Sequence, residues 1–583
     1  MHAKISPLTI CLPVCAALLG IAVPAFGQTA ETLAEQRAQY DAVRSKSVIE
    51  LQPFRNRVEA THAESGLEIA LTSLNPAVGG WYLLELRQGG AAETRVYHIE
   101  NPLPEARALE LDTAQPPALR IGGTACRPWQ GEPAALDQAA GTGLAYVPLC
   151  DGRLLLRNRV RGSRTNLEAA AEILRDNVWG GESVVRFVRE TFFRDSELET
   201  SQELATGAAT GARDGPPPMR TRADGDERPV INTLLDIGLD DTPGAGRMTI
   251  GLWYRAAGVP GVYASAFQPR AIAQEVLDGP GNTNRLDSVE GKATGYMVAF
   301  DMAEFDMGFA LGTDHPALDW SPRPAASARP KGLPGPDGVK SADPLVRLGM
   351  VNPVAANKTV ATFTAGFKRR HGAFKFGDMA TFNMGHHYGF IEQGVIFSKL
   401  QPSLSTIYGL TDGSIHMKTW TEADNALLPG IRFARQNGVP LLETDPETGA
   451  GVPGDRVTRW GPGNWSGSAE AELRTLRAGA CMVDDDGTRY LLYGYFSTAT
   501  PSAMARTFQA YGCNYAMLLD MNALEHTYLA LYVRRGGKVH VQHMVPGMAL
   551  IDKKLRGGTV LPRFIGYADN RDLFYLTRKG PAQ

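Results

Sequence analysis

A short stretch near the C-terminus gathers side chains that are suited to ionic and proton-transfer chemistry. The apolar run at 515–519 ends at Asp520, and three further polar residues follow closely: Asn522, Glu525 and His526. A carboxylate can stabilise or attack a cationic carbon, and a histidine can exchange a proton near neutral pH. Polar residues at the end of a buried strand favour a functional site. A turn that Asp520 tightens with local backbone bonds is an equally good interpretation.

The residues before this stretch predict the elements that would hold it in place. Thr500 is suited to cap a helix, Pro501 to begin it and Gly512 to end it. Three side chains at helical spacing should point into the core: Met504, Phe508 and Tyr511. We therefore predict a helix and a buried strand that carry Asp520 to the edge of a core.

A second candidate group follows another predicted strand, TFTAGF at 362–367, which contains Thr364 and Gly366. Lys368 and Arg369 come directly after this strand. Basic residues at a strand end favour an anionic ligand, although a basic run is more often a solvated surface.

A polar, glycine-punctuated loop at 376–390 contains Asn383, which could add a ligand contact. His386 and His387 in this loop are adjacent, and adjacent histidines rarely bind one metal ion together. We therefore predict no metal site and no cofactor. A divalent cation bound by the carboxylates at 484–486 is a weaker interpretation than a hairpin turn there.

The composition of the chain limits its partners. Of its 583 residues 43% are hydrophobic and 21% are charged, and the formal net charge is −3. Such a chain can bury large cores, and the near balance of charge argues against nucleic acid as a partner. Beyond the N-terminal segment, no stretch is long and apolar enough to be predicted to span a membrane.

Residues 1–27 are predicted to be a secretory signal peptide. They combine Lys4, an apolar stretch and small residues before a cleavage position that follows Gly27. We therefore predict an exported protein, either periplasmic or secreted.

Signal cleavage would leave four cysteines in an oxidising compartment, where disulfides are favoured. Four cysteines allow three connectivities. The pairing that closes the shortest loops joins Cys126 to Cys150 and Cys481 to Cys513. Four buried free thiols are the alternative.

The chain is predicted to contain two domains. Residues 28–204 should form a β-rich domain that ends in two helices, the second at 182–193. Residues 205–228 are rich in glycine, proline and charge and are predicted to be a flexible linker. Residues 229–583 show a mixed α/β pattern, so the predicted class is α+β.

The first of these two helices has a recognisable start. Thr165 and Glu168 show the spacing of a capping box, in which the two side chains bond each other's backbone N–H groups.

Seven motifs in the second domain follow a characteristic order. They are PGVYASAF at 260–267, VAFDMAEFDM at 298–307, TFTAGF at 362–367, GVIFS at 394–398, TDGS at 411–414, RAGACMVDDDG at 477–487 and AMLLDMNA at 516–523. This order resembles that of the phosphodiester glycosidase family over roughly residues 250–580. The resemblance implies a phosphodiester-glycosidase-like domain in which the proline-rich stretch 321–344 is an insertion.

The resemblance also implies roles for individual residues. Asp520 matches the family's late aspartate and would be the catalytic carboxylate, and Arg477 would contact phosphate. Glu525 and His526 are further catalytic candidates because they lie close to Asp520 in the sequence. Substrate contacts would come from Thr364, Gly366 and Asn522 at the matched motifs. The basic run and the polar loop described above would add Lys368, Arg369 and Asn383.

Cleavage of a sugar–phosphate bond calls for a carboxylate and a basic clamp, since the sugar gains positive charge and the phosphate gains negative charge. The leading hypothesis is an exported hydrolase of phosphodiester-linked glycosides in envelope or extracellular glycans. Asp520, Arg477 and Thr364 would then line one cleft.

Two departures from the family pattern favour an alternative hypothesis. Thr364 stands where the family has asparagine, and Met521 and Asn522 stand where it has two glycines. A non-catalytic saccharide-binding or structural envelope protein on the same fold is therefore the second hypothesis.

Overall fold

The computed structural model describes residues 47–131, 134–166, 168–170, 194–206, 211–222, 228–316, 318, 334, 339–368, 389–459 and 471–580. Several features predicted above lie outside these residues. They are the signal peptide at 1–27, the helix at 182–193, most of the proline-rich stretch 321–344, Arg369, Asn383, His386 and His387.

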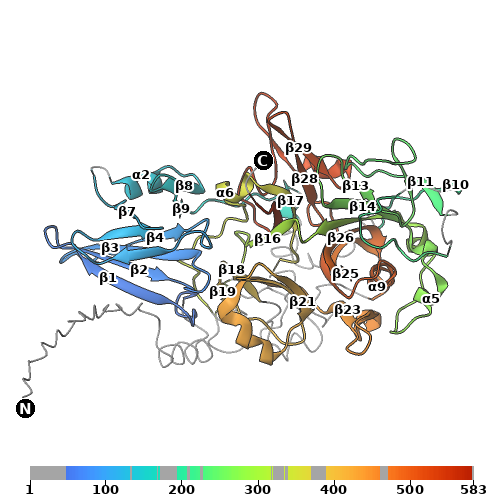
Figure 1. Ribbon diagram of the computed structural model, residues 1–583, viewed down its shortest axis with the longest axis horizontal. Coiled ribbons are helices and arrows are strands. Elements are labelled where there is room, and N and C mark those ends of the chain that lie inside the picture. The colour runs from blue at the N-terminus through green and yellow to red at the C-terminus, as the bar shows by residue number, and fades with distance from the viewer. Residues whose placement is uncertain are drawn as a thin grey trace, which may run out of the picture.

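The N-terminal region is built from two antiparallel sheets. The larger has the strand order β1 (Asn56–Thr61), β2 (Leu67–Ser73), β3 (Trp81–Gln88), β4 (Arg95–Glu100), β9 (Leu154–Arg157) and β8 (Tyr146–Leu149). The smaller consists of β5 (Leu109–Asp112), β6 (Ala118–Ile121) and β7 (Thr124–Cys126). Both sheets and helix α2 (Ala135–Gly141) contribute to one apolar core, which includes Leu84, Leu119 and Leu136. Figure 1 shows this region at one end of the long axis.

The rest of the chain is organised around an eight-stranded sheet. Its order is β13 (Tyr254–Arg255), β14 (Val262–Phe267), β15 (Gly295–Asp301), β26 (Thr488–Ala499), β25 (Thr475–Asp485), β27 (Tyr515–Met521), β23 (Pro440–Thr444) and β24 (Gly451–Pro453). Helix α9 (Pro501–Ala510) packs beside this sheet, against β23 and β26 (Figure 1).

Two five-stranded sheets complete the main core. One contains β16 (Phe305–Ala310), β32 (Leu573–Arg578), β17 (Thr359–Thr364), β28 (Leu529–Arg535) and β29 (Lys538–His543). The other contains β19 (Val395–Ser398), β18 (Phe390–Glu392), β22 (Ile431–Gln436), β20 (Ser405–Leu410) and β21 (Ile415–Thr419). Rings from both sheets pack together with centroids 5.3 to 6.4 Å apart: Phe309, Phe433 and Phe574.

The α+β prediction is wrong, because the described part of the chain is mostly β-strand in several sheets, with few helices. Antiparallel neighbours can be joined by short turns and need no crossover helix. Strands such as β15 and β27 are one reason for the wrong prediction, because their residues are almost all buried. Such continuous apolar runs are also typical of the parallel sheets of α/β proteins.

Helix α9 and the strand that follows it form as predicted. Thr500 accepts a hydrogen bond from the backbone N–H of Ala503, Pro501 begins the helix, and Gly512 has a φ of 77°. The three predicted core side chains are buried: Met504, Phe508 and Tyr511.

Both predicted disulfides are present. One joins Cys126 of β7 to Cys150, and the other joins Cys481 of β25 to Cys513 before β27. The second ties the start of the Asp520-bearing strand to a neighbouring strand of the same sheet.

Part of the predicted linker lies against the core. Met219 is fully buried, and its backbone N–H donates to the carbonyl of Gly251. The N–H of Ala212 donates to the carbonyl of Trp253, whose indole donates to the carbonyl of Pro217. Parts of residues 211–222 therefore pack against the larger region, while other residues of this segment are exposed.

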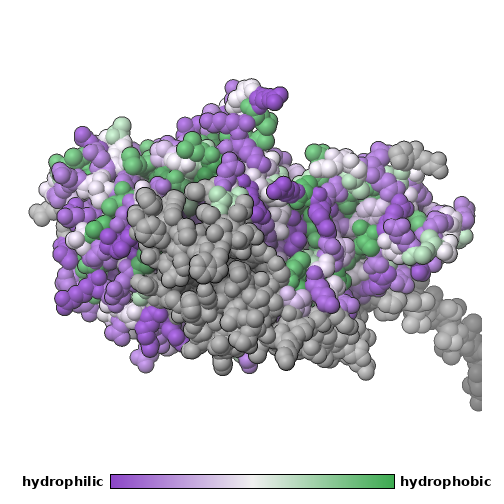
Figure 2. Space-filling model, turned by 180° about the vertical axis from the view of Figure 1, so that it is seen from behind, coloured by the Kyte–Doolittle hydropathy of each residue, from purple (hydrophilic) through white to green (hydrophobic). Residues whose placement is uncertain are grey.

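The surface in Figure 2 has hydrophobic residues dispersed among hydrophilic ones where the chain is described. None of the helices in the described ranges combines the length and hydrophobicity needed to cross a bilayer.

Candidate functional site

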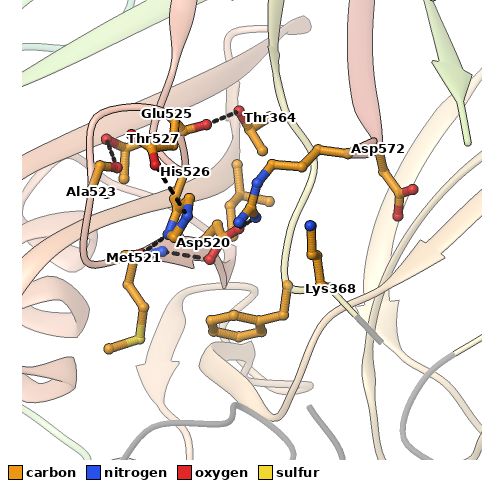
Figure 3. A network of polar contacts seen from close by, with 12 residues as sticks. Thr364, Lys368, Asp520, Met521, Ala523, Glu525, His526, Thr527 and Asp572 are labelled. Carbon is orange, nitrogen blue, oxygen red and sulfur yellow. Dashed lines mark hydrogen bonds and ion pairs between the residues drawn. The ribbon is translucent and has the colours of Figure 1, made fainter. Parts of the chain in front are cut away.

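Asp520 occupies a buried position near the end of β27, with 2% of its surface exposed. Its Oδ2 accepts a hydrogen bond from Arg571 Nη1 at 2.5 Å, and its Oδ1 accepts one from the backbone N–H of Met521. Figure 3 shows this carboxylate beside the turn that carries His526. Asp520 is therefore held in an interior ion pair and does not face open solvent.

Arg571 connects Asp520 to two further charged residues. Its Nη2 donates to Oε1 of Glu168 at 2.9 Å. The Nζ of Lys368 lies 2.6 Å from the same oxygen. We call Asp520, Arg571, Glu168 and Lys368 the Arg571 cluster; each residue is at most 5% exposed.

The cluster approaches the surface at Asp314, whose side chain is 28% exposed. Lys368 Nζ lies 2.9 Å from Oδ2 of Asp314, and Arg164 pairs with the same carboxylate from outside. Asn570 donates weakly to both Glu168 and Asp314, at 3.4 Å in each case. A chain of alternating charges therefore runs from buried Asp520 to the exterior.

Electrostatics keeps Glu168 ionised. Burial alone would raise its pKa, but the charges of Arg571 and Lys368 lower the pKa well below its ordinary value. Burial works in the opposite direction on Arg571, where Glu168 and Asp520 raise the pKa of the guanidinium. Arg571 and Glu168 are therefore both charged at neutral pH.

Glu168 reaches the cluster from a helical turn, and the capping box predicted there is half formed. Its backbone N–H donates to Oγ1 of Thr165 at 3.1 Å, as a capping threonine requires. Its carboxylate does not return the bond but binds Arg571 and Lys368 instead. The hydroxyl of Thr165 donates to Oε1 of Glu525.

Arg477 does not meet Asp520, although both lie on neighbouring strands. The pairing of β25 with β27 shifts between Arg477 and Gly479, so that Arg477 lies opposite Met521. One residue of slip turns a side chain to the other face of a sheet. Accordingly, Arg477 binds the sulfur of Met521 and the carbonyls of Ala499 and Leu473.

Three other predicted site residues meet at the turn after β27. The carbonyl of Glu525 accepts a 3.5 Å hydrogen bond from Thr364, and it also accepts from Arg563 Nη1. His526 donates from Nδ1 to the carbonyl of Met521 at 2.6 Å, since that partner can only accept. Its Nε2 lies 3.9 Å from Oε1 of Glu525. Figure 3 shows Thr364 and this turn above Asp520, with Lys368 across from it.

Gly366 and Asn522 both adopt backbone conformations with positive φ, at 155° and 80°. A Cβ on Gly366 would lie 2.6 Å from Oδ1 of Asn437, which accepts a hydrogen bond from the N–H of Phe367. Gly366 is therefore required for that contact. Asn522 tolerates this conformation, because asparagine is among the non-glycine residues that most readily enter this region.

Sequence reasoning missed Arg571, which stands in the polar run DNRD directly before β32. That run also places Asp569 on Arg563 and Asp572 on His315 and Arg435. This dense group of charged residues next to an apolar strand was the feature of the sequence that could have indicated Arg571. Glu168 was recognised only as a helix cap.

Metal ligands do not gather in the part of the chain that is described: no group of three or more His, Cys, Asp or Glu side chains there could hold a metal ion. Within these ranges, Arg571 and Lys368 are the cations that face the carboxylates of the cluster.

No family model and no curated protein matches this chain. Among solved structures, the catalytic domain of zebrafish N-acetylglucosamine-1-phosphodiester alpha-N-acetylglucosaminidase, auto-inhibited by its pro-peptide, is 10% identical, with a TM-score of 0.28 over 56% of this chain and 86% of that one. A hypothetical protein from Synechocystis is 11% identical, with a TM-score of 0.25 over 86% and 97%. A putative exported protein from Burkholderia pseudomallei is 12% identical, with a TM-score of 0.16 over 90% and 96%. Similarities this weak do not establish a shared fold.

Proposed function

We propose that this chain is an exported hydrolase that cleaves the bond between a sugar and a phosphate in envelope or extracellular glycan phosphodiesters. The observation that carries the proposal is the ion pair of Asp520 with Arg571, beside the ammonium of Lys368. This set supplies one carboxylate and two cations, which is what separation of a sugar cation from a phosphate anion requires. The two disulfides fit an oxidising compartment.

In this proposal, each group acts on one of the two developing charges. Asp520 would stabilise or attack the anomeric carbon as positive charge develops there. Arg571 and Lys368 would bind the departing phosphate by charge-assisted hydrogen bonds. Phosphate is a good leaving group, so holding its charge matters more than protonating it. Nε2 of His526 would exchange a proton with water, because its Nδ1 is engaged with the carbonyl of Met521.

The proposal is tested with the purified full chain and a phosphodiester of N-acetylglucosamine linked through C1, with release of free sugar as the readout. Asp520→Asn should lower the rate by at least about 100-fold, since it removes the only charge proposed to face the sugar. Glu290→Gln is a matched control, because Glu290 is equally buried but binds the backbone N–H of Thr500 outside the cluster. Equal rates in Asp520→Asn and wild type would refute the assignment.

The burial of the Arg571 cluster favours a second function. Asp520 is almost inaccessible, and Met521 stands where the family pattern has a glycine, which would let a ligand approach the backbone closely. A non-catalytic saccharide-binding or structural envelope protein would keep the same charges to hold the fold together. Saccharide binding without turnover, unchanged in Asp520→Asn, would support this second function.

A further inference from the structure

Glu168 makes contacts that an anionic ligand would make. Its Oε1 lies 2.9 Å from Arg571 Nη2 and 2.6 Å from Lys368 Nζ, so one oxygen is shared by two buried cations. Its other oxygen faces the amide of Asn570. A guanidinium, an ammonium and an amide that converge on one carboxylate resemble the donors with which proteins bind phosphate.

We infer that the Arg571 cluster is an oxyanion site, specific for a phosphate monoester or diester, in which Glu168 is the built-in occupant. A ligand phosphate enters by displacing the Glu168 carboxylate from Arg571 and Lys368. This inference rests on the proposed function, because it assigns the position of the phosphate in that reaction. It adds that the described structure is the occupied, latent form of the site.

Charge balance supports an exchange of Glu168 for phosphate. Arg571, Lys368 and Arg164 face the carboxylates of Asp520, Glu168 and Asp314, three charges of each sign. A phosphodiester carries one negative charge, as Glu168 does, so the exchange leaves the balance unchanged. Removal of Glu168 without replacement leaves one buried positive charge in excess, which is costly in a site of low polarity.

The attachment of Glu168 is suited to displacement. Glu168 lies in a helical turn and not in a sheet, and the turn is held by the hydroxyl of Thr165. The chain just before it is fixed, because Ser163 exchanges backbone hydrogen bonds with Ala568 and Asn570. Displacement of Glu168 therefore needs the movement of one side chain and its turn, while Arg571, just before β32, and Lys368, after β17, remain in place.

A donor of Arg571 is left over even when Glu168 is bound. Its Nε is buried and has no hydrogen-bond partner among the described residues. An unpaired buried donor costs free energy. A phosphate has more acceptor oxygens than a carboxylate and can bond Nε and Nη2 of one guanidinium together.

The test is calorimetric titration of the full chain with inorganic phosphate at constant ionic strength. Glu168→Ala should bind phosphate at least about tenfold more tightly than wild type, because an intramolecular competitor has been removed. Glu100→Ala is the matched control, since Glu100 is an equally buried carboxylate on another buried arginine, Arg157. It should show no gain.

Two further variants keep the test decisive. If Glu168→Ala does not fold, Glu168→Gln removes the charge with little change of volume and should show the same gain. Lys368→Met added to either variant should abolish the gain, and a gain that persists there would mean that phosphate binds elsewhere. A folded Glu168 variant with wild-type phosphate affinity would overturn the inference.

The results also separate this inference from the proposed function. Tighter phosphate binding without any sugar release leaves the oxyanion site intact and refutes the hydrolase. Sugar release that Asp520→Asn abolishes, with unchanged phosphate affinity in Glu168→Ala, keeps the hydrolase and refutes the built-in occupant.

Discussion

Two buried arginines, Arg571 and Arg157, each meet two carboxylates, yet their surroundings differ in charge. Arg157 on β9 binds Glu100 at 2.5 Å and lies 3.7 Å from Glu392, in the contact between the N-terminal sheet and the larger region. We call these three residues the Arg157 cluster. No lysine joins them in the contacts of the described chain, whereas Lys368 joins Arg571.

The difference in charge appears in the protonation of the second carboxylate. Burial raises the pKa of Glu392 to about 8, against the opposing charge of Arg157, so Glu392 is mostly neutral at pH 7. In the Arg571 cluster the pKa of Glu168 is instead lowered. One guanidinium balances one carboxylate at the Arg157 cluster, while two cations hold Glu168 charged. The first arrangement suits a structural contact, and the second suits the binding of anions.

The largest expected effect comes from removing each arginine. Arg571→Met leaves Glu168 and Asp520 without their shared guanidinium and should lower the free energy of unfolding by about 3–5 kcal/mol at pH 7. Arg157→Met should cost less, because Glu392 is already neutral there. Urea denaturation of both variants measures this order, and a larger loss in Arg157→Met would contradict the comparison.

The pH dependence of stability between pH 5 and pH 8 tests the protonation state of Glu392. Because its pKa in the folded protein is raised from 4.5 to about 8, its contribution to stability is complete below pH 4.5 and is lost as the pH rises to about 8. Glu392→Gln removes this loss. Between pH 5 and pH 8 the variant should gain on the order of a few kcal/mol relative to wild type in urea denaturation. Parallel pH profiles would show that Glu392 is ionised in the folded protein.

The contribution of Glu168 to stability should change with pH in the opposite direction, at acidic pH. Its pKa in the folded protein is lowered, so its contribution to stability is present above about pH 4.5 and is lost as the pH falls further. The difference in the free energy of unfolding between wild type and Glu168→Gln should therefore decrease below this pH, by on the order of 1–2 kcal/mol. Denaturation profiles from pH 3 to 6 measure the convergence, and a constant difference would contradict it.

These differences also explain what the sequence could reveal. Caps, apolar spacing and loop length are local, and they predicted α9, the burial of β27 and both disulfides. The pairing of Arg571 with Glu168 spans 403 residues and depends on how the sheets pack, which local patterns do not encode.

The position of Arg477 depends on a single irregularity. Regular pairing continued from Gly479 and Leu518 would have placed Arg477 opposite Asp520, as the prediction required. The shift between Arg477 and Gly479 places it opposite Met521 instead. A β-bulge of one residue leaves little trace in composition or periodicity, so the choice between Arg477 and Arg571 could only come from coordinates.

The smallest expected effect concerns how each cluster holds its carboxylate. Glu100 lies on β4 and is fixed by a strand ladder, whereas Glu168 is positioned by one turn that Thr165 caps. Thr165→Val removes the capping oxygen and should lower the free energy of unfolding by about 1 kcal/mol, while Thr165→Ser should restore it. If the cap stabilises the protein only by positioning Glu168, Thr165→Val should cost much less in a Glu168→Ala background. The double-mutant cycle measures this coupling in urea denaturation. An equal cost of Thr165→Val in both backgrounds would mean that the turn is stable by itself and that Glu168 is held as firmly as Glu100.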